Sequence, residues 1–265
     1  MHQQYKTFIL DEPIAHVLRI TLNRPDTANA INTAMIRELC DFWAACYTEV
    51  APNWRCIVLR GSGHTFCAGA DLKERNTMSD SEWLTQHAIF EQAFTHMMQC
   101  PLPILAAVNG AAFGGGLELL LASDFVYAVS SATFSFPEVK RGIIPGAYGT
   151  QNLPRACGAR RAKEIILTGQ SFTAAEAHRW NIVNQLFDTE TQLMEGVLNT
   201  ARQIAANAPL AIRQAKKSLN VALQSSLQTG YMFEIEAYNR LIATDDRREG
   251  VMAFNEKREP SFVGK

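Results

Sequence analysis

Hydrophobic and polar positions follow two different periods in the first half of the chain. They alternate one by one over His16–Leu22, which predicts a strand, and the β-rich segment Thr7–Leu10 predicts another, with a turn at Asp11–Pro13 between them. From Thr33 to Val50 apolar residues recur every three or four positions, as in an amphipathic helix. Further elements are predicted as strands at Cys56–Leu59, Pro103–Val108, Phe125–Val129 and Thr133–Phe136, and as helices at Ser81–Met98 and from the Gly114–Gly116 run to Ala122. This alternation is typical of an α/β domain.

The last third of the chain has a different pattern, which is almost wholly helical. After a turn at Ile144–Thr150, the predicted helices are Arg160–Thr168, Ala174–Arg179, Glu190–Asn207, Leu210–Ser225, Leu227–Ala243 and Asp246–Lys257. Pro209 marks a boundary near residue 205, with no low-complexity linker and no internal repeat. We therefore divide the chain into an α/β core, residues 1–204, and a C-terminal helical region, residues 205–265.

Composition narrows the class of protein. The 25 basic and 26 acidic residues give a net charge of -1, which supplies no overall field to attract nucleic acid or an anionic membrane. With 47% hydrophobic residues but no apolar run long enough to cross a bilayer, the chain reads as a soluble globular protein, and residues 1–10 carry no targeting pattern, so we expect a cytoplasmic location. The six cysteines form no CxxC pair, which argues against a structural zinc site, and no metal ligand set is expected.

Two glycine-rich turns, Phe66–Asp71 and Gly114–Glu118, each lie between a predicted strand and a predicted helix. Small residues let a ligand approach the backbone, so unpaired N–H groups of both turns could form an oxyanion hole. The alternative is that the glycines only permit tight strand-to-helix packing. A nucleotide-phosphate site is excluded, since no Lys-Ser/Thr follows the glycines and neither turn has the GxGxxG pattern.

Two acidic residues stand among apolar neighbours. Glu118 interrupts the run Leu117–Ala122, where a buried carboxylate needs compensation, and Glu138 follows the apolar segment Phe134–Pro137. Such a pair can divide acid and base work. Alternatively, Glu118 is a first-turn glutamate stabilised by the helix dipole, and Glu138 is an ordinary exposed turn residue.

Four blocks in order resemble the enoyl-CoA hydratase/isomerase (crotonase) family over nearly the whole chain: FCAGADLKER at 66–75, NGAAFGGGLELLLASD at 109–124, FPEVKRGIIPGAYGTQNLPR at 136–155 and AFNEKREP at 253–260. The resemblance implies a crotonase-like spiral of ββα units followed by a helical region that packs homotrimers, which often pair into hexamers. It also implies an acyl-CoA thioester substrate and no cofactor, since coenzyme A is part of the substrate.

The resemblance implies roles for particular residues. Ala68 and Gly115 would be the two oxyanion-hole donors; Glu118 would activate water for attack at C3, and Glu138 would handle the proton at C2. The acyl-CoA channel would be lined by Ala68, Gly69, Ala70, Asp71 and Leu72, while Phe254 and Lys257 would touch the nucleotide end of CoA. Asp71 is also a candidate N-cap of the segment that follows it.

Both glutamates are present, which favours an enoyl-CoA hydratase in fatty-acid or branched amino-acid breakdown. There are two alternatives. The first is an isomerase or another enolate-stabilising acyl-CoA enzyme of the same fold, and the second is a non-catalytic acyl-CoA or RNA-binding protein. FCAGADLKER also resembles the methylglutaconyl-CoA hydratase branch, some of whose members bind RNA through a lysine-bearing first helix. Here that helix has only Arg37 against three acidic residues, so no nucleic acid is expected. Tyr148, where the family usually has glycine, could narrow the acyl pocket, bond to substrate or simply pack.

Overall fold

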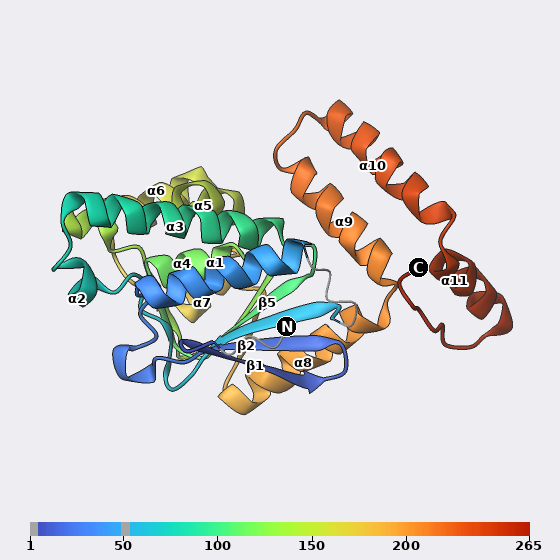
Figure 1. Cartoon of the computed structure of the whole chain (residues 1–265), viewed down its shortest axis with the longest axis horizontal. Coiled ribbons are helices and arrows are strands. Elements are labelled where there is room, and N and C mark those ends of the chain that lie inside the picture. Colours follow the sequence, from blue (N-terminus) through green and yellow to red (C-terminus); the bar gives the residue numbers. More distant parts are fainter. Residues whose placement is uncertain (1–4, 49–53) are drawn as a thin grey trace.

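The computed structural model describes residues 5–48 and 54–265. Two sheets carry the fold (Figure 1). The larger has the strand order β1-β2-β3-β5-β7-β10, formed by Phe8–Ile14, Val17–Leu22, Cys56–Gly61, Ile104–Val108, Phe125–Val129 and Gln185–Phe187. The smaller has the order β4-β6-β8-β9, formed by Thr65–Cys67, Ala111–Phe113, Thr133–Ser135 and Phe172–Thr173.

From β3 to β8, consecutive strands alternate between the two sheets, which produces a repeated ββα unit. β3 pairs in the larger sheet and β4 in the smaller; β5 and β6, then β7 and β8, do the same. Helices follow the first two pairs: α2 (Leu72–Arg75) and α3 (Asp80–Gln99) after β4, and α4 (Gly115–Leu121) after β6. The parallel pairing of β3, β5 and β7 requires these crossovers. The predicted α/β spiral of ββα units is confirmed.

The first hairpin differs from its prediction. β1 runs through Pro13 to Ile14, which pairs with Val17, so the turn lies at residues 15–16 and not at Asp11–Pro13. β1 is an edge strand with a register irregularity between Asp11 and Ile14, and an edge tolerates a proline that cannot donate to the ladder. The turn places His16 at a φ of 65°.

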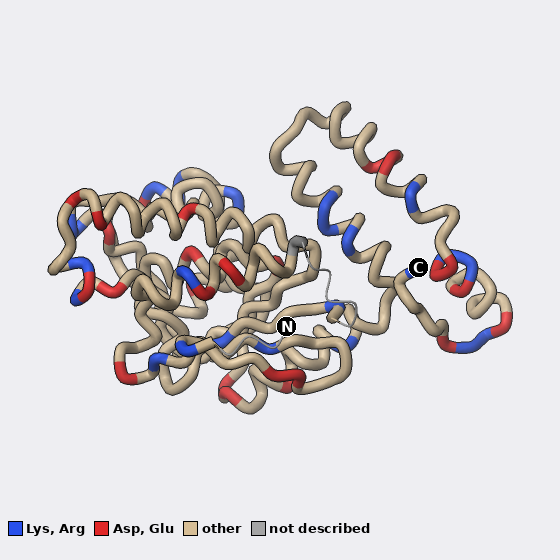
Figure 2. The backbone as a smooth tube through the Cα atoms, viewed as in Figure 1, with Lys and Arg blue, Asp and Glu red and all other residues tan. Residues whose placement is uncertain are grey.

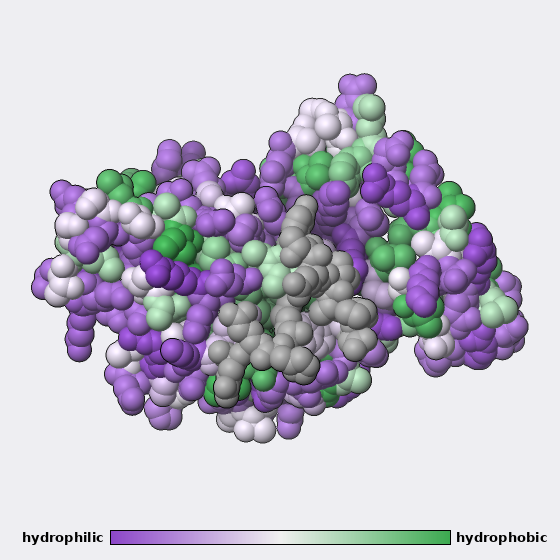
Figure 3. Space-filling model, viewed as in Figure 1, coloured by the Kyte–Doolittle hydropathy of each residue, from purple (hydrophilic) through white to green (hydrophobic). Residues whose placement is uncertain are grey.

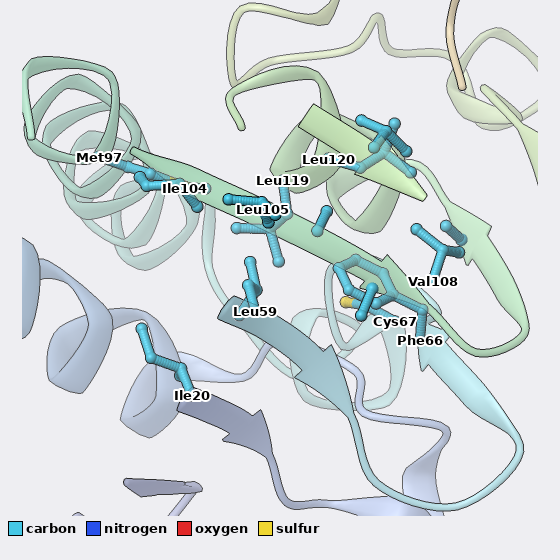
Figure 4. Close-up of a cluster of buried hydrophobic side chains, with 14 of the residues drawn as sticks. Ile20, Leu59, Phe66, Cys67, Met97, Ile104, Leu105, Val108, Leu119 and Leu120 are labelled. Carbon is cyan, nitrogen blue, oxygen red and sulfur yellow. The ribbon is translucent and has the colours of Figure 1, made fainter. Parts of the chain in front are cut away.

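The core lies between the larger sheet and helices α1 (Thr33–Thr48) and α3. All five residues of β5 are buried, as expected for a strand with parallel neighbours on both sides. Figure 4 shows Leu59, Ile104 and Leu105 of this sheet, with Met97 of α3 and Leu119 of α4, in one cluster. α4 is thereby anchored in the core, and its N-terminus is held at a fixed position against the smaller sheet. The predicted end of α1 at Val50 lies outside the described residues.

The C-terminal helices form an arm. α8 (Glu190–Ala206) packs on strands β3, β5 and β7, whereas α9 (Pro209–Ala222), α10 (Leu227–Ile242) and α11 (Asp245–Glu256) extend away from the sheets (Figure 1). The division at residues 204/205 stays a prediction, and the arm begins with α9. Apolar surface gathers on this arm (Figure 3); its exposed large hydrophobic residues include Leu219, Leu223, Leu227, Tyr231, Met232, Ile235 and Tyr238.

Along the chain, three helices lie between β8 and β10: α5 (Gly149–Cys157), α6 (Ala159–Thr168) and α7 (Ala174–Arg179). The predictions for α6, α7 and the four later helices are confirmed to within three residues at their ends. α5 was not predicted. It contains Pro154, which lacks an N–H and normally ends a helical pattern, but which stands near the end of this nine-residue helix.

Candidate active site

A cavity of about 880 Å³ opens where the two glycine-rich turns meet helix α3 and the segment that precedes α5. Its walls include Ala70 and Gly115 from the two turns and both predicted catalytic glutamates, Glu118 and Glu138. Residues predicted from separate sequence blocks are therefore brought together in one cavity. Among the described residues there is no cluster of three or more side chains suited to a metal ion.

The first donor of the cavity is the N–H of Gly115, the first residue of α4. The first N–H groups of a helix have no intrahelical acceptor, and within the described chain this one donates to no other group. Gly114 before it adopts a φ of 50°, a left-handed conformation that glycine supplies at little cost. The predicted placement of Gly115 at a free N–H is what the structure shows, and its role as a donor remains a prediction.

The second donor is Ala70, not Ala68 as predicted. The N–H of Ala68 donates to the Ala28 carbonyl at 3.0 Å and is not free for a ligand. The Gly69 carbonyl accepts from the N–H of Ile31, and the N–H of Asp71 donates to the Ile31 carbonyl. The N–H of Ala70, which lies between them, therefore points to the opposite side and has no acceptor in the described part of the chain. A Cβ built on Gly115 would lie 3.7 Å from that nitrogen, so the two free N–H groups are neighbours.

Glu118 is a buried carboxylate fixed by the backbone. It lies in the first turn of α4 with 4% of its surface exposed, and its Oε1 accepts hydrogen bonds from the N–H groups of Ala147, at 2.7 Å, and Gly149, at 2.9 Å. Burial raises the pKa of Glu118 to about 7, while the two backbone bonds limit the rise and the charge of Glu138 adds to it. A carboxyl group with a pKa near neutrality is suited to proton transfer.

Glu138 approaches the same place from the other side. It begins a short 3-10 helix, Glu138–Arg141, after the end of β8, and a Cβ on Gly114 would meet its Oε1 at 2.6 Å, so the carboxyl group lies over the start of α4. Its Oε2 is buried and has no hydrogen-bond partner among the described residues. Burial raises its pKa, and the nearby Arg141 opposes the rise. A buried oxygen without a partner is expected to receive one from a ligand or water.

Four of the five predicted channel residues line the cavity: Ala68, Gly69, Ala70 and Leu72. Asp71 does not line it. Its side chain caps α2 by accepting from Glu74 N and pairs with Arg24 at 3.1 Å, so the N-cap alternative is the confirmed one. Ala68 does lie at the wall, although its N–H is engaged.

Phe254 and Lys257 lie far from this cavity. Both belong to the end of α11 on the arm, away from α2 and the cavity walls (Figure 1), and neither lines the cavity. Phe254 is 83% exposed. Within one chain, therefore, neither residue reaches a ligand bound between the glycine-rich turns.

Tyr148 adopts a φ of 70°, which explains why glycine is suited to this position. Its hydroxyl bonds to Thr95 Oγ1 of α3 at 2.9 Å. Tyr148 and Gln151 line both the main cavity and a second one of about 740 Å³ beside α9, so these two side chains lie between the cavities. Tyr148 therefore packs against the core and also forms a wall at one end of the cavity, and whether it narrows the acyl pocket or bonds to substrate stays a prediction.

The structure also adds residues that sequence reasoning missed: Arg75, Trp83, Leu84, His87 and Phe90 line the cavity from α2 and α3. Their helical spacing gave no sign of a site, because an apolar helical face is usually core. Arg75 is a charged residue four positions after the glycine-rich turn, at the end of α2.

Glu118 should make stability depend on pH. Its pKa is about 7 in the folded chain, above the ordinary value of 4.5, so its contribution to stability is fully present below pH 4.5 and is lost as pH rises through 7. We therefore expect Glu118→Gln to gain stability relative to the unmodified protein as pH rises from about 5 to about 8. Urea unfolding of both proteins across this range measures the difference in unfolding free energy, and a difference that does not change with pH would contradict the prediction.

A cavity that pairs two carboxyl groups with two free backbone N–H groups is chemically suited to stabilising negative charge on a carbonyl oxygen while protons are moved. Comparison with known proteins gives the family. The model of the enoyl-CoA hydratase/isomerase family matches residues 12–265. The chain is 43% identical to YngF of Bacillus subtilis, named an enoyl-CoA hydratase/isomerase, over 94% of this chain and 95% of that one.

Other relatives agree. The 2,3-dehydroadipyl-CoA hydratase of Escherichia coli is 38% identical over 94% of this chain and 96% of its own length. The crystal structure of an enoyl-CoA hydratase from Bacillus anthracis superposes with a TM-score of 0.94 at 40% identity, covering 98% of this chain and 100% of that one. The chain belongs to the enoyl-CoA hydratase/isomerase family, and its fold is the crotonase fold. No helix in the described ranges is long and apolar enough to cross a membrane.

Proposed function

We propose that this protein is an enoyl-CoA hydratase, which adds water across the 2,3 double bond of an enoyl-CoA thioester. The observation that carries the proposal is the meeting of Glu118, Glu138 and the free N–H groups of Ala70 and Gly115 in one cavity. Two carboxyl groups allow one to take a proton while the other gives one. No separate cofactor is required, because coenzyme A enters with the substrate.

The proposed reaction uses each group once. The thioester oxygen accepts hydrogen bonds from Ala70 and Gly115, which stabilise the enolate charge that develops when water attacks C3. Glu118, held as an acceptor by two N–H groups, takes the proton from water; Glu138, whose free oxygen and raised pKa favour the protonated form, gives its proton to C2. The water oxygen bonds to C3, the double bond becomes a single bond, and a proton passes back to Glu138 from Glu118 or solvent to restore the site.

The test is the ultraviolet absorbance of the conjugated thioester when the purified protein is mixed with crotonyl-CoA. Loss of absorbance with formation of a hydroxyacyl-CoA supports hydration. A protein that is silent here but converts a β,γ-unsaturated thioester to the conjugated isomer without gaining water would be an isomerase. A protein that binds acyl-CoA and turns over neither substrate would be a binding protein. Either of the last two results rejects the proposal.

Tyr148 is expected to limit the length of the acyl group, because it lies between the two cavities. Tyr148→Ala should join them and raise kcat/KM for long straight-chain enoyl-CoA relative to crotonyl-CoA by about tenfold. Thr95→Val keeps the Tyr148 side chain and removes the hydrogen bonds of Thr95 Oγ1 to the Tyr148 hydroxyl and to the Glu91 carbonyl; it is the control and should preserve the profile. An identical chain-length profile in Tyr148→Ala would mean that the side chain only packs.

The enzyme is proposed to be a homotrimer or a hexamer of two trimers. Its arm exposes Ile235 at 58% and Tyr238 at 68% on one helix, and exposed apolar surface of this kind marks interfaces. Phe254 and Lys257 would then contact coenzyme A only in another copy. Light scattering is expected to give a trimeric or hexameric mass, and Ile235→Asp should lower it. A monomeric mass for the unmodified protein would reject the assembly.

A further inference from the structure

Arg75 is a charged residue in the apolar part of the cavity. It is the last residue of α2, only 8% of its surface is exposed, and it lines the cavity. Its guanidinium carbon lies 4.6 Å from the ring centre of Trp83 and 5.1 Å from that of Phe90, both on α3. The guanidinium group is therefore packed against aromatic side chains, where cation–π contact holds it but supplies no hydrogen-bond acceptor.

Within the described residues, only one of the three guanidinium nitrogens of Arg75 has a hydrogen-bond partner. Nε donates to Gln86 Oε1 at 2.8 Å, whereas Nη1 and Nη2 donate to no atom of the described chain. No carboxylate oxygen there lies within 4 Å of them. Both Nη atoms keep some exposed surface, since the unpartnered side-chain atoms with almost no exposed surface are, among the described residues, Glu138 Oε2 and Arg213 Nε. The two free Nη groups are thus accessible from the cavity.

The side chain of Gln86 fixes the orientation of Arg75. Gln86 is 3% exposed, and its Nε2 donates to Thr33 Oγ1 at 2.8 Å and Glu74 Oε2 at 3.0 Å. With Oε1 accepting from Arg75, the Gln86 amide is held at both ends. Glu74 Oε2 also accepts from the N–H of Thr33, and Glu74 forms no ion pair with Arg75 within 4 Å. The charges of Glu118 and Glu74 oppose the fall in the pKa of Arg75, but neither carboxylate is hydrogen-bonded to it. This network presents the edge of the guanidinium fork to the cavity.

A buried guanidinium without an acceptor is costly. Burial lowers the pKa of Arg75, but a guanidinium group remains protonated at neutral pH. Burying a charge is tolerated when it is paired and hydrogen-bonded, and here the paired state requires an anion that the cavity receives. Two Nη groups in one plane match the two oxygens of a carboxylate.

We propose that Arg75 binds a carboxylate carried by the acyl group, so that the preferred substrates are enoyl-CoA thioesters of dicarboxylic acids. This proposal rests on the proposed function of the cavity and extends it to a substrate class. The apolar walls Leu72, Trp83 and Phe90 hold the carbon chain, and the single cation among them selects a chain that ends in a negative charge. A neutral acyl group in the same place would leave the guanidinium desolvated and unpaired.

The competing explanation is that Arg75 acts on Glu118. Its positive charge opposes the rise in the pKa of Glu118, although the two side chains form no ion pair within 4 Å. In that case Arg75 would be a positioning residue, and its loss would affect every substrate equally and shift the pH profile of kcat. Recognition of a substrate carboxylate affects only the substrate that carries it.

The experiment compares two substrates that differ in one group: trans-2-hexenoyl-CoA and the CoA monothioester of trans-2-hexenedioic acid. The unmodified enzyme is expected to prefer the diacid in kcat/KM. Arg75→Met, which keeps apolar bulk against Trp83, should lower the ratio of diacid to neutral kcat/KM by about ten- to hundredfold. Arg75→Lys, a second variant in case the methionine protein does not fold, should keep part of the ratio because it keeps the charge.

The control is Arg141→Met. Arg141 lines the same cavity but is exposed and donates to the Pro137 carbonyl at 3.0 Å, so its loss should leave the ratio as it is. Three results would overturn the proposal. The first is loss of the diacid preference in Arg141→Met and not in Arg75→Met. The others are an unchanged ratio in Arg75→Met, or an equal fall in kcat/KM for both substrates in Arg75→Met with a shifted pH profile. Calorimetry of the binding of the saturated adipyl-CoA monothioester and of hexanoyl-CoA tests carboxylate recognition without turnover. It therefore distinguishes a failure of carboxylate recognition by Arg75 from a failure of the proposed hydration.

Discussion

Glu118→Gln is expected to lower kcat for hydration by about a hundred- to ten-thousandfold. Glutamine keeps the size of the side chain, and its amide oxygen can still accept from Ala147 and Gly149, so the loop before α5 stays in place. What disappears is the group that accepts a proton from water. Glu138→Gln should cause a loss of similar size, because Glu138 supplies the proton at C2 in the proposed reaction. Steady-state hydration of the preferred enoyl-CoA measures both losses.

Two comparisons make this result specific. Glu234→Gln on α10 replaces an exposed glutamate outside the cavity and should retain full activity. Binding of a saturated acyl-CoA to Glu118→Gln should remain within about threefold, since the oxyanion donors are intact. The double variant Glu118→Gln/Glu138→Gln should have a kcat little below that of the less active single variant, because the losses caused by residues that act in one step do not add. Near-normal turnover in Glu118→Gln would remove Glu118 from the chemistry.

The larger features of the fold could be predicted because they repeat along the chain. Three- and four-residue apolar spacing located α1, α3 and the later helices, and five apolar residues in a row located β5. The three-residue strands β4 and β6 were missed, because so short a segment has no measurable period and owes its conformation to pairing with strands far away in sequence.

The site shows the same limit at the level of single atoms. The sequence predicted that the turn at residues 66–71 supplies an N–H donor, but not which one. Whether the N–H of Ala68 or Ala70 is free depends on partners forty residues away, Ala28 and Ile31. Arg75 was overlooked for the same reason: its free Nη groups become visible only when Gln86 and the aromatic residues of α3 are in place.

The charges of the molecule also agree with a local anion site. Basic and acidic residues are interspersed along the backbone (Figure 2), as the net charge of -1 led us to expect. The overall field therefore does little to select an anionic substrate. In such a protein a substrate carboxylate is recognised by one desolvated cation, since charges inside a cavity interact more strongly than exposed ones.

Gly116→Ala is expected to damage both stability and turnover. A Cβ at this position in α4 would lie 2.1 Å from the Cys67 carbonyl oxygen and 2.8 Å from its carbon, which are backbone atoms of β4 that cannot rotate away. Relief requires α4 to move from β4, and overpacking of this kind costs about 1–3 kcal/mol of unfolding free energy. Because α4 carries Gly115 and Glu118, the same movement separates the two N–H donors, and loss of one such donor lowers kcat by about a hundredfold or more.

Gly230→Ala is the matched control for this substitution. Gly230 lies within helix α10, where the nearest atom to an added Cβ is Ser225 Oγ at 3.8 Å, so alanine should raise helix stability by about 0.5–1 kcal/mol and leave turnover intact. Urea unfolding and steady-state kinetics on the two variants separate the general effect of alanine from the contact with Cys67. If Gly116→Ala unfolds at the same urea concentration as the unmodified protein and hydrates at its rate, the close packing of α4 on β4 does not position the donors.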